Sequence, residues 1–314
     1  MLEEVLYILQ DYTFQIVALG TGLLGLLSGV VGSFTTLQKE SLLGDALSHA
    51  ALPGIVIGYM IIGSKDWLFL LGGATISGLV ATIVIQWLSK NGKVKFDNAL
   101  SLVLSSFFGL GLVLMTYLQR TPDGDQAGID NFIYGQASSM LLRDVQTLII
   151  AVVIGVLLVI IFWKELKIYS FDPKYAKTLG LNTIFIQGLL SIIMIFTIIL
   201  GLESVGVILM SALLVGPAVA ARQWTNRLSV MVSLSGSFGF LSGIIGTLIS
   251  SLYTQIPTGP TIVVVLSVIV FISLFFAPKR GIISSKRAYY KRKKEYALLL
   301  KERQERDGDR HYVA

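Results

Sequence analysis

Long runs of apolar residues dominate the chain and predict membrane-spanning helices. Crossing a bilayer takes about 20 consecutive, mostly apolar residues, and the runs at 145–162 and 184–200 approach that length without one charge. The pattern predicts spans at 13–36, 44–63, 68–89, 99–119, 145–163, 184–201, 205–221, 229–253 and 262–278. The pair on either side of 201–204 leaves two alternatives open, two full spans or one span with a re-entrant segment. We therefore expect an all-α integral membrane protein, a polytopic bundle of eight or nine transmembrane helices.

The distribution of Lys and Arg orients this bundle. The segment from Lys279 onward carries 12 Lys/Arg and 5 Asp/Glu, and of the 13 Lys/Arg before it, ten fall in loops on the same side and three on the other. Cytoplasmic loops carry the excess of basic residues, so we expect a plasma-membrane protein with a cytoplasmic C-terminus and an extracytoplasmic N-terminus. This divides the chain into a transmembrane domain, 1–280, and a basic, helical cytoplasmic tail, 281–314. A basic segment directly after a span is typical of contact with anionic lipid, and no nucleic-acid partner is expected.

Several chemistries are excluded by what the sequence lacks. There is no cysteine, and the only histidines are His49 and His311, which excludes thiolate metal sites, disulfides and a polyhistidine site within one chain. No G-x-x-x-x-G-K-[ST] loop occurs, so the chain cannot hydrolyse ATP by itself. The H-E-x-x-H and G-x-S-x-G signatures of hydrolases are also missing. We therefore expect a transport subunit rather than an enzyme, driven by a separate ATPase or by an ion gradient.

Residues 41–60 are the most informative stretch. Asp45 and His49 are four residues apart, so on a helix they share one face. Ionisable residues inside a span usually face the bundle interior or a water-filled path, and a carboxylate with an imidazole can hold a divalent cation. Pro53 has no N–H, which leaves the carbonyl of His49 without its helical donor and predicts a kink there. The alternatives are a structural Asp–His hydrogen bond and an ordinary proline kink.

A second irregular segment covers residues 201–224. Pro217 frees the carbonyl of Leu213 by the same argument. Glu203 is the only acidic residue between Asp172 and the tail, and we consider it either as a contact on the metal path near the outer mouth or as a plain helix-end residue.

The loop between the predicted spans at 145–163 and 184–201 contains a short helix. Asp172 followed by a proline fits an N-cap and a first helical position, and Gly180 fits the end of the helix. Tyr175, Ala176 and Leu179 are expected to share one face, which gives an amphipathic helix on the cytoplasmic side. The alternative is a simple interfacial connector.

At these residues the chain resembles a known family. LLGDALSHAALPG, 42–54, followed downstream by VGVILMSALLVGPAVAA, 205–221, is similar to the membrane permeases of manganese, zinc and iron ABC importers. LSSFFGLGLVLMTYLQR, FIYGQ and SFDPKYAKTLG lie between them in the same order as in that family. The resemblance covers residues 10–280, and its most specific part is the segment with Asp45, His49 and Pro53.

The resemblance implies several properties. It implies a permease that pairs with itself or with a paralogous permease around a central path, a separate cytoplasmic ATP-binding subunit, and an extracytoplasmic metal-binding lipoprotein. Asp45 and His49 match the positions that line the metal path, and 172–180 matches the segment that meets the ATPase. No permanently bound cofactor is implied, only the transported ion, with manganese first and zinc or iron next. The other readings are an ion-gradient-driven carrier of divalent cations and a membrane scaffold or enzyme subunit with a structural Asp–His pair.

Overall fold

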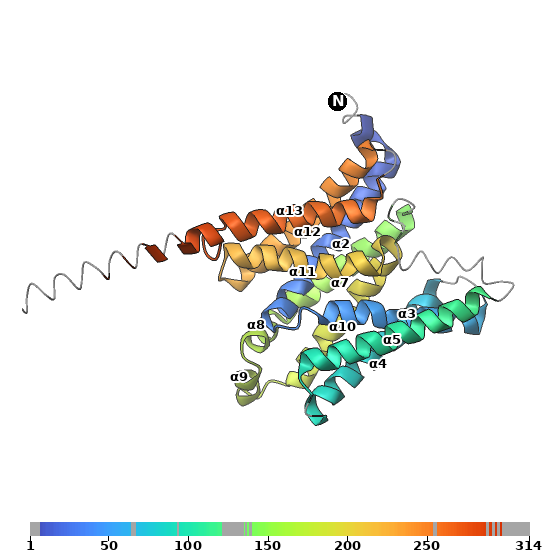
Figure 1. Cartoon of the computed structure of the whole chain (residues 1–314), viewed down its shortest axis with the longest axis horizontal. Coiled ribbons are helices and arrows are strands. Elements are labelled where there is room, and N and C mark those ends of the chain that lie inside the picture. Colours follow the sequence, from blue (N-terminus) through green and yellow to red (C-terminus); the bar gives the residue numbers. More distant parts are fainter. Residues whose placement is uncertain are drawn as a thin grey trace, which may run out of the picture.

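The protein is a bundle of helices, described from a computed structural model (Figure 1). The structure describes residues 7–63, 67–92, 94–120, 135, 137, 140–253, 256–286, 289, 290, 293 and 296, without the side chains of 67, 68, 203, 204, 207 and 208. Within these ranges there are helices and no strand. The principal helices are α2 (Tyr12–Leu37), α3 (Leu43–Ile62), α4 (Trp67–Asn91), α5 (Phe96–Gln119), α7 (Leu142–Ile161), α8 (Trp163–Phe171), α9 (Pro173–Thr178), α10 (Thr183–Val205), α11 (Val207–Trp224), α12 (Leu228–Leu252) and α13 (Thr258–Phe276).

Eight of these helices are long and apolar enough to cross a membrane, counted over the described residues: α2, α3, α4, α5, α7, α10, α12 and α13. They agree with the predicted spans to within a few residues, which confirms the all-α polytopic membrane fold. Most of the segment between the predicted spans at 99–119 and 145–163 lies outside the described residues. So does most of the predicted tail, of which 282–286 is helical.

The packing of α11 bears on the two alternatives for this segment, a ninth crossing or a re-entrant segment. A Cβ on Gly259, at the start of α13, would lie 3.4 Å from Leu209, and one on Gly216 would lie 2.7 Å from Leu266. At the other end, the Trp224 indole donates to the Ser273 hydroxyl over 2.9 Å. These contacts place the start, the middle and the end of α11 beside α13, a helix of membrane-spanning length, which favours two full spans over a re-entrant segment.

Two seams of small residues bring helix backbones into direct contact. Along the antiparallel pair α2 and α12, a Cβ on Gly25 would overlap the carbonyl of Gly239, and the Ser235 hydroxyl donates to the carbonyl of Gly29 over 2.7 Å. Along α3 and α4, a Cβ on Gly54 would overlap the carbonyl of Gly73. Close backbone approach of this kind is the usual route to tight association of membrane helices, because lipid removes most of the hydrophobic driving force.

The helix α8, which the sequence did not predict, joins α7 to α9 at one end of the bundle. In Figure 1, α8, α9 and the C-terminal end of α13 lie on the left, whereas the C-terminal end of α5 lies on the right. The α8 helix is attached to the end of α2 by an edge-on contact between Trp163 and Phe34, and by a hydrogen bond of 3.3 Å from Gln38 to Ser170. The loop between α7 and α10 is therefore a packed helical platform and not a flexible connector.

Candidate functional site

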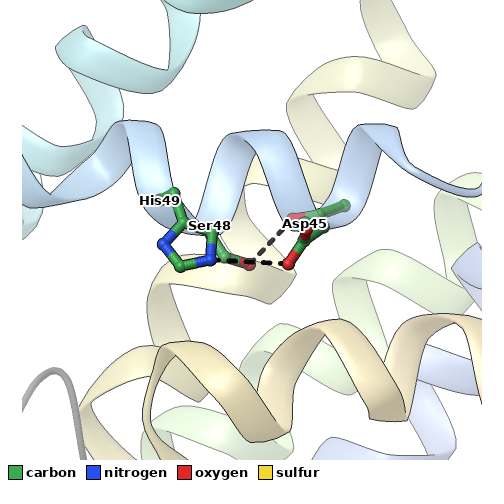
Figure 2. Close-up of polar contacts among 4 residues, drawn as sticks. Asp45, Ser48 and His49 are labelled. Carbon is green, nitrogen blue, oxygen red and sulfur yellow. Dashed lines mark hydrogen bonds and ion pairs between the residues drawn. The ribbon is translucent and has the colours of Figure 1, made fainter. Parts of the chain in front are cut away.

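The candidate site lies on α3, near the start of a membrane span. Asp45 is in the first turn of the helix, where the unpaired N–H groups favour a negative charge. His49 follows one turn later, and Figure 2 shows both side chains on the same side of α3. The proximity predicted from the four-residue spacing is confirmed.

The two side chains are close enough to share one ion. Nε2 of His49 is 3.6 Å from Oδ1 of Asp45, too long for a hydrogen bond. Metal ions bind imidazole nitrogen and carboxylate oxygen at about 2.0–2.2 Å, so an ion between these two atoms can reach both. The same distance lies within the range of an ion pair when His49 is protonated, so a structural Asp–His contact stays the alternative.

Access differs between the two ligand candidates. The Asp45 side chain is 38% exposed and that of His49 is 19% exposed. Nδ1 of His49 is buried and has no hydrogen-bond partner among the described residues. The ring of Phe108, on α5, packs edge-to-face against the imidazole, with centroids 4.6 Å apart and planes at 72°.

The neighbouring polar and proline residues shape α3 and leave the pair free. The Ser48 hydroxyl donates to the carbonyl of Gly44 over 2.8 Å (Figure 2), so it is engaged within its own helix. Pro53 lies inside α3, and the helix continues through it to Ile62. The Ala50 carbonyl, one residue after His49, accepts a 2.6 Å hydrogen bond from Ser77 of α4. This hydrogen bond from α4 therefore lies one residue beyond the His49 carbonyl, which is the one that Pro53 leaves without a helical donor.

The other predicted site residues lie apart from the Asp45–His49 pair or have side chains outside the described residues. Pro217 is buried inside α11. Leu214 of the same helix packs against Gly44 of α3, where an added Cβ on Gly44 would lie 2.8 Å from Cδ1 of Leu214. Glu203 falls in the last turn of α10, and its side chain lies outside the described residues. Within the description, no group of three or more His, Cys, Asp or Glu gathers around one point. The described part of the chain therefore presents two candidate side-chain ligands, Asp45 and His49, at this point.

The short helix α9 forms as predicted at both ends. The Asp172 carboxylate accepts from the backbone N–H groups of Lys174 and Tyr175, each over 3.0 Å, and Gly180 adopts φ 79° just beyond the helix. The predicted common face is wrong. Ala176 is completely buried against α8 and α10, whereas Tyr175 and Leu179 are 55% and 51% exposed. A six-residue helix makes too few turns for sequence periodicity to define a face.

Glu40 is a half-buried acid that the sequence analysis did not single out. It lies between α2 and α3, five residues before Asp45, and burial raises the pKa of its carboxyl from 4.5 to about 7. Together with burial, its charge raises the pKa of Tyr169, on α8, to about 12. The group thus sits where the platform meets the start of the helix that bears the candidate ligands.

The sequence analysis did not single out Phe108 either. It stands in an apolar run in which every residue fits a membrane span, so no local pattern distinguishes it from Phe107. Only the packing of α5 against α3 brings it to His49.

Comparisons with known proteins agree with this architecture. Residues 10–277 match the model of the ABC 3 transport family. The chain is 44% identical to the zinc transport system membrane protein TroC of Treponema pallidum, over 90% of this chain and 95% of that protein. It is 42% identical to the manganese transport system membrane protein MntC of Bacillus subtilis, over 90% of this chain and 65% of that longer protein. The solved structure of PsaBC from Streptococcus pneumoniae in complex with Fab superposes with a TM-score of 0.79 at 30% identity, over 91% of this chain and all of that chain.

Proposed function

Because the chain belongs to the ABC 3 transport family, we propose that it is the permease subunit of an importer that moves a divalent transition-metal ion into the cytoplasm. The observation that carries the proposal is the Asp45–His49 pair, whose ligand atoms lie 3.6 Å apart inside a span. Relatives named for zinc and manganese transport support the same class of substrate.

The ligand chemistry limits the choice of ion. Carboxylate and imidazole without sulfur suit Mn²⁺, Zn²⁺ and Fe²⁺, and a share of oxygen ligands favours Mn²⁺. We therefore place manganese first, then zinc and iron. Two ligands from one chain hold an ion weakly, which suits a path that must release what it binds.

Assembly completes the site in this proposal. A two-fold or pseudo-two-fold pairing, with a second copy or with a paralogous permease, brings two Asp–His pairs to one axis and raises the side-chain ligands to four. No permanently bound cofactor is required.

Energy and delivery come from other subunits in this proposal. A cytoplasmic ATP-binding subunit docks on the platform, with Tyr175 and Leu179 of the α9 region exposed toward it. An extracytoplasmic metal-binding lipoprotein delivers the ion at the opposite end. This arrangement places the C-terminus in the cytoplasm and the N-terminus outside, as the Lys/Arg distribution predicts.

The test is metal uptake per molecule of inserted permease, with the ATPase and the binding protein present. Asp45→Asn and His49→Gln remove a ligand at nearly constant size, and we expect both to insert normally and to lose uptake. Ser48→Ala is the matched control, since the Ser48 hydroxyl donates to the carbonyl of Gly44 within the same helix. Parental uptake by both ligand variants would remove the pair from the path. Uptake that persists with an ATPase unable to hydrolyse ATP would favour the ion-gradient-driven carrier instead.

A further inference from the structure

The outer contact of the His49 imidazole is unusual for a metal ligand. Metal-binding histidines almost always donate their second ring N–H to a carboxylate, a carbonyl or a water, which fixes the ring and raises its basicity. When Nε2 of His49 faces Asp45 and the ion, Nδ1 carries the proton, and this atom is buried without a hydrogen-bond partner in the described part of the chain. The group that packs against the ring is the apolar side chain of Phe108.

We propose that Phe108 is a positioning residue for the transported ion, which holds the His49 imidazole in its ligand orientation through ring contact in place of a hydrogen bond. The proposal rests on the proposed function, since it concerns the same Asp–His pair. It adds a residue from a second helix, α5, to a site built so far from α3 alone.

The geometry explains how a ring can take over this role. At a centroid distance of 4.6 Å and an interplanar angle of 72°, the two rings form an edge-to-face pair, which is a preferred arrangement of aromatic side chains. Because the contact is specific in angle, it resists rotation of the imidazole away from Asp45. His49 is only 19% exposed, so little solvent competes for this position.

The choice of an apolar contact has a consequence for transport. A carboxylate that accepted the Nδ1–H hydrogen bond would make Nε2 of His49 a more basic metal ligand, and the ion would be held longer. Phe108 supplies orientation without added basicity, so the ion is bound in a defined geometry and is still released readily. A transit site needs both properties, whereas a storage site needs only tight binding.

Phe107 provides a matched comparison within the same helix. It is also a partly buried phenylalanine of α5, packed against the main hydrophobic core. Phe107→Leu therefore removes the same number of atoms from the neighbouring position of α5 without removing the ring that contacts His49. A purely space-filling role of Phe108 predicts equal effects of the two substitutions.

The experiment measures manganese uptake as a function of concentration in the complete transporter, normalised to inserted permease. We expect Phe108→Leu to raise KM about 10-fold, the scale of lost outer contacts at metal sites, whereas Phe108→Tyr, which keeps the ring, and Phe107→Leu keep the parental KM. Equal KM values for Phe108→Leu and Phe107→Leu would overturn the positioning role. Asp45→Asn, measured in parallel, separates the two proposals: uptake lost in Asp45→Asn with an unchanged KM in Phe108→Leu refutes only the positioning role, and uptake retained in Asp45→Asn refutes the site itself.

Discussion

Replacement of Glu40 by glutamine should stabilise the protein in a pH-dependent manner. Glu40 is half-buried in the segment that joins α2 to α3, and this burial raises the pKa of its carboxyl from 4.5 to about 7. An acid with a raised pKa destabilises the fold once it ionises. Below pH 4.5 it is neutral in both states and contributes nothing. Between pH 4.5 and 7 only the unfolded state loses the proton, so stability falls as pH rises, and above pH 7 the loss is constant.

The size of the effect follows from the displacement of the pKa. Each pKa unit corresponds to about 1.36 kcal/mol, so the ionised Glu40 carboxylate destabilises the folded state by about 3 kcal/mol above pH 7, an upper limit because part of the side chain is solvated. Glutamine keeps the shape and cannot ionise. For a protein of this size, that difference corresponds to an increase in apparent Tm on the order of 5 °C.

The assay is thermal unfolding of the purified permease in one detergent at pH 5 and at pH 8.5. We expect the Tm difference between Glu40→Gln and the parent to be small at pH 5 and to increase toward pH 8.5. Asp97→Asn, which neutralises an exposed acid in the first turn of α5, controls for the loss of one negative charge. A Tm difference that is the same at both pH values would refute the reasoning, because the gain would then not come from ionisation.

Three further predictions test packing, docking and assembly. Gly25→Ala should lower the stability of the fold by about 1–3 kcal/mol, because its Cβ would overlap the carbonyl of Gly239. Gly72→Ala is the control, since nothing lies within 4 Å of a Cβ there, and equal apparent Tm values for the two variants would contradict the close seam. Tyr175→Glu should reduce co-purification of the ATP-binding subunit without changing Tm, because the Tyr175 side chain is exposed. Ala176→Glu should lower Tm, because Ala176 is fully buried. Normal association of the Tyr175→Glu variant would exclude α9 from docking. Since the chain has no native cysteine, single cysteines at the exposed Leu42, just before α3, and Ile57, within α3, should cross-link paired permeases. Failure at both positions with efficient cross-linking elsewhere would place the seam on another helix.

The sequence predicts those parts of the structure that depend on local geometry. The spans follow from the length of the apolar runs, because bilayer thickness fixes how many residues a helix needs. The approach of Asp45 to His49 follows from the helical repeat alone, and the Asp172 N-cap from the Asp-Pro pair. These predictions required no knowledge of which helices are neighbours.

The missed features depend on which helices pack together. Phe108 reaches His49 only because α5 lies against α3. The charge of Glu40 acts on Tyr169 only because the unpredicted helix α8 lies beside the segment that joins α2 to α3. Ala176 is turned inward by α8 and α10, which local amphipathicity does not reveal. In a chain where most positions are apolar, hydropathy separates membrane from water but does not separate lipid-facing from helix-facing positions.

The seam between α2 and α12 limits which mutations its two glycine codons can accept. Where Gly25 meets Gly239, each backbone occupies the space that a Cβ would need on the other helix. Every single-base change in a glycine codon is either silent, a stop, or introduces an amino acid with at least a Cβ. A single-base missense mutation at either codon therefore always adds a side chain at the contact. Because the facing residue is already glycine, no smaller residue can make room for it, and the two helices must move apart.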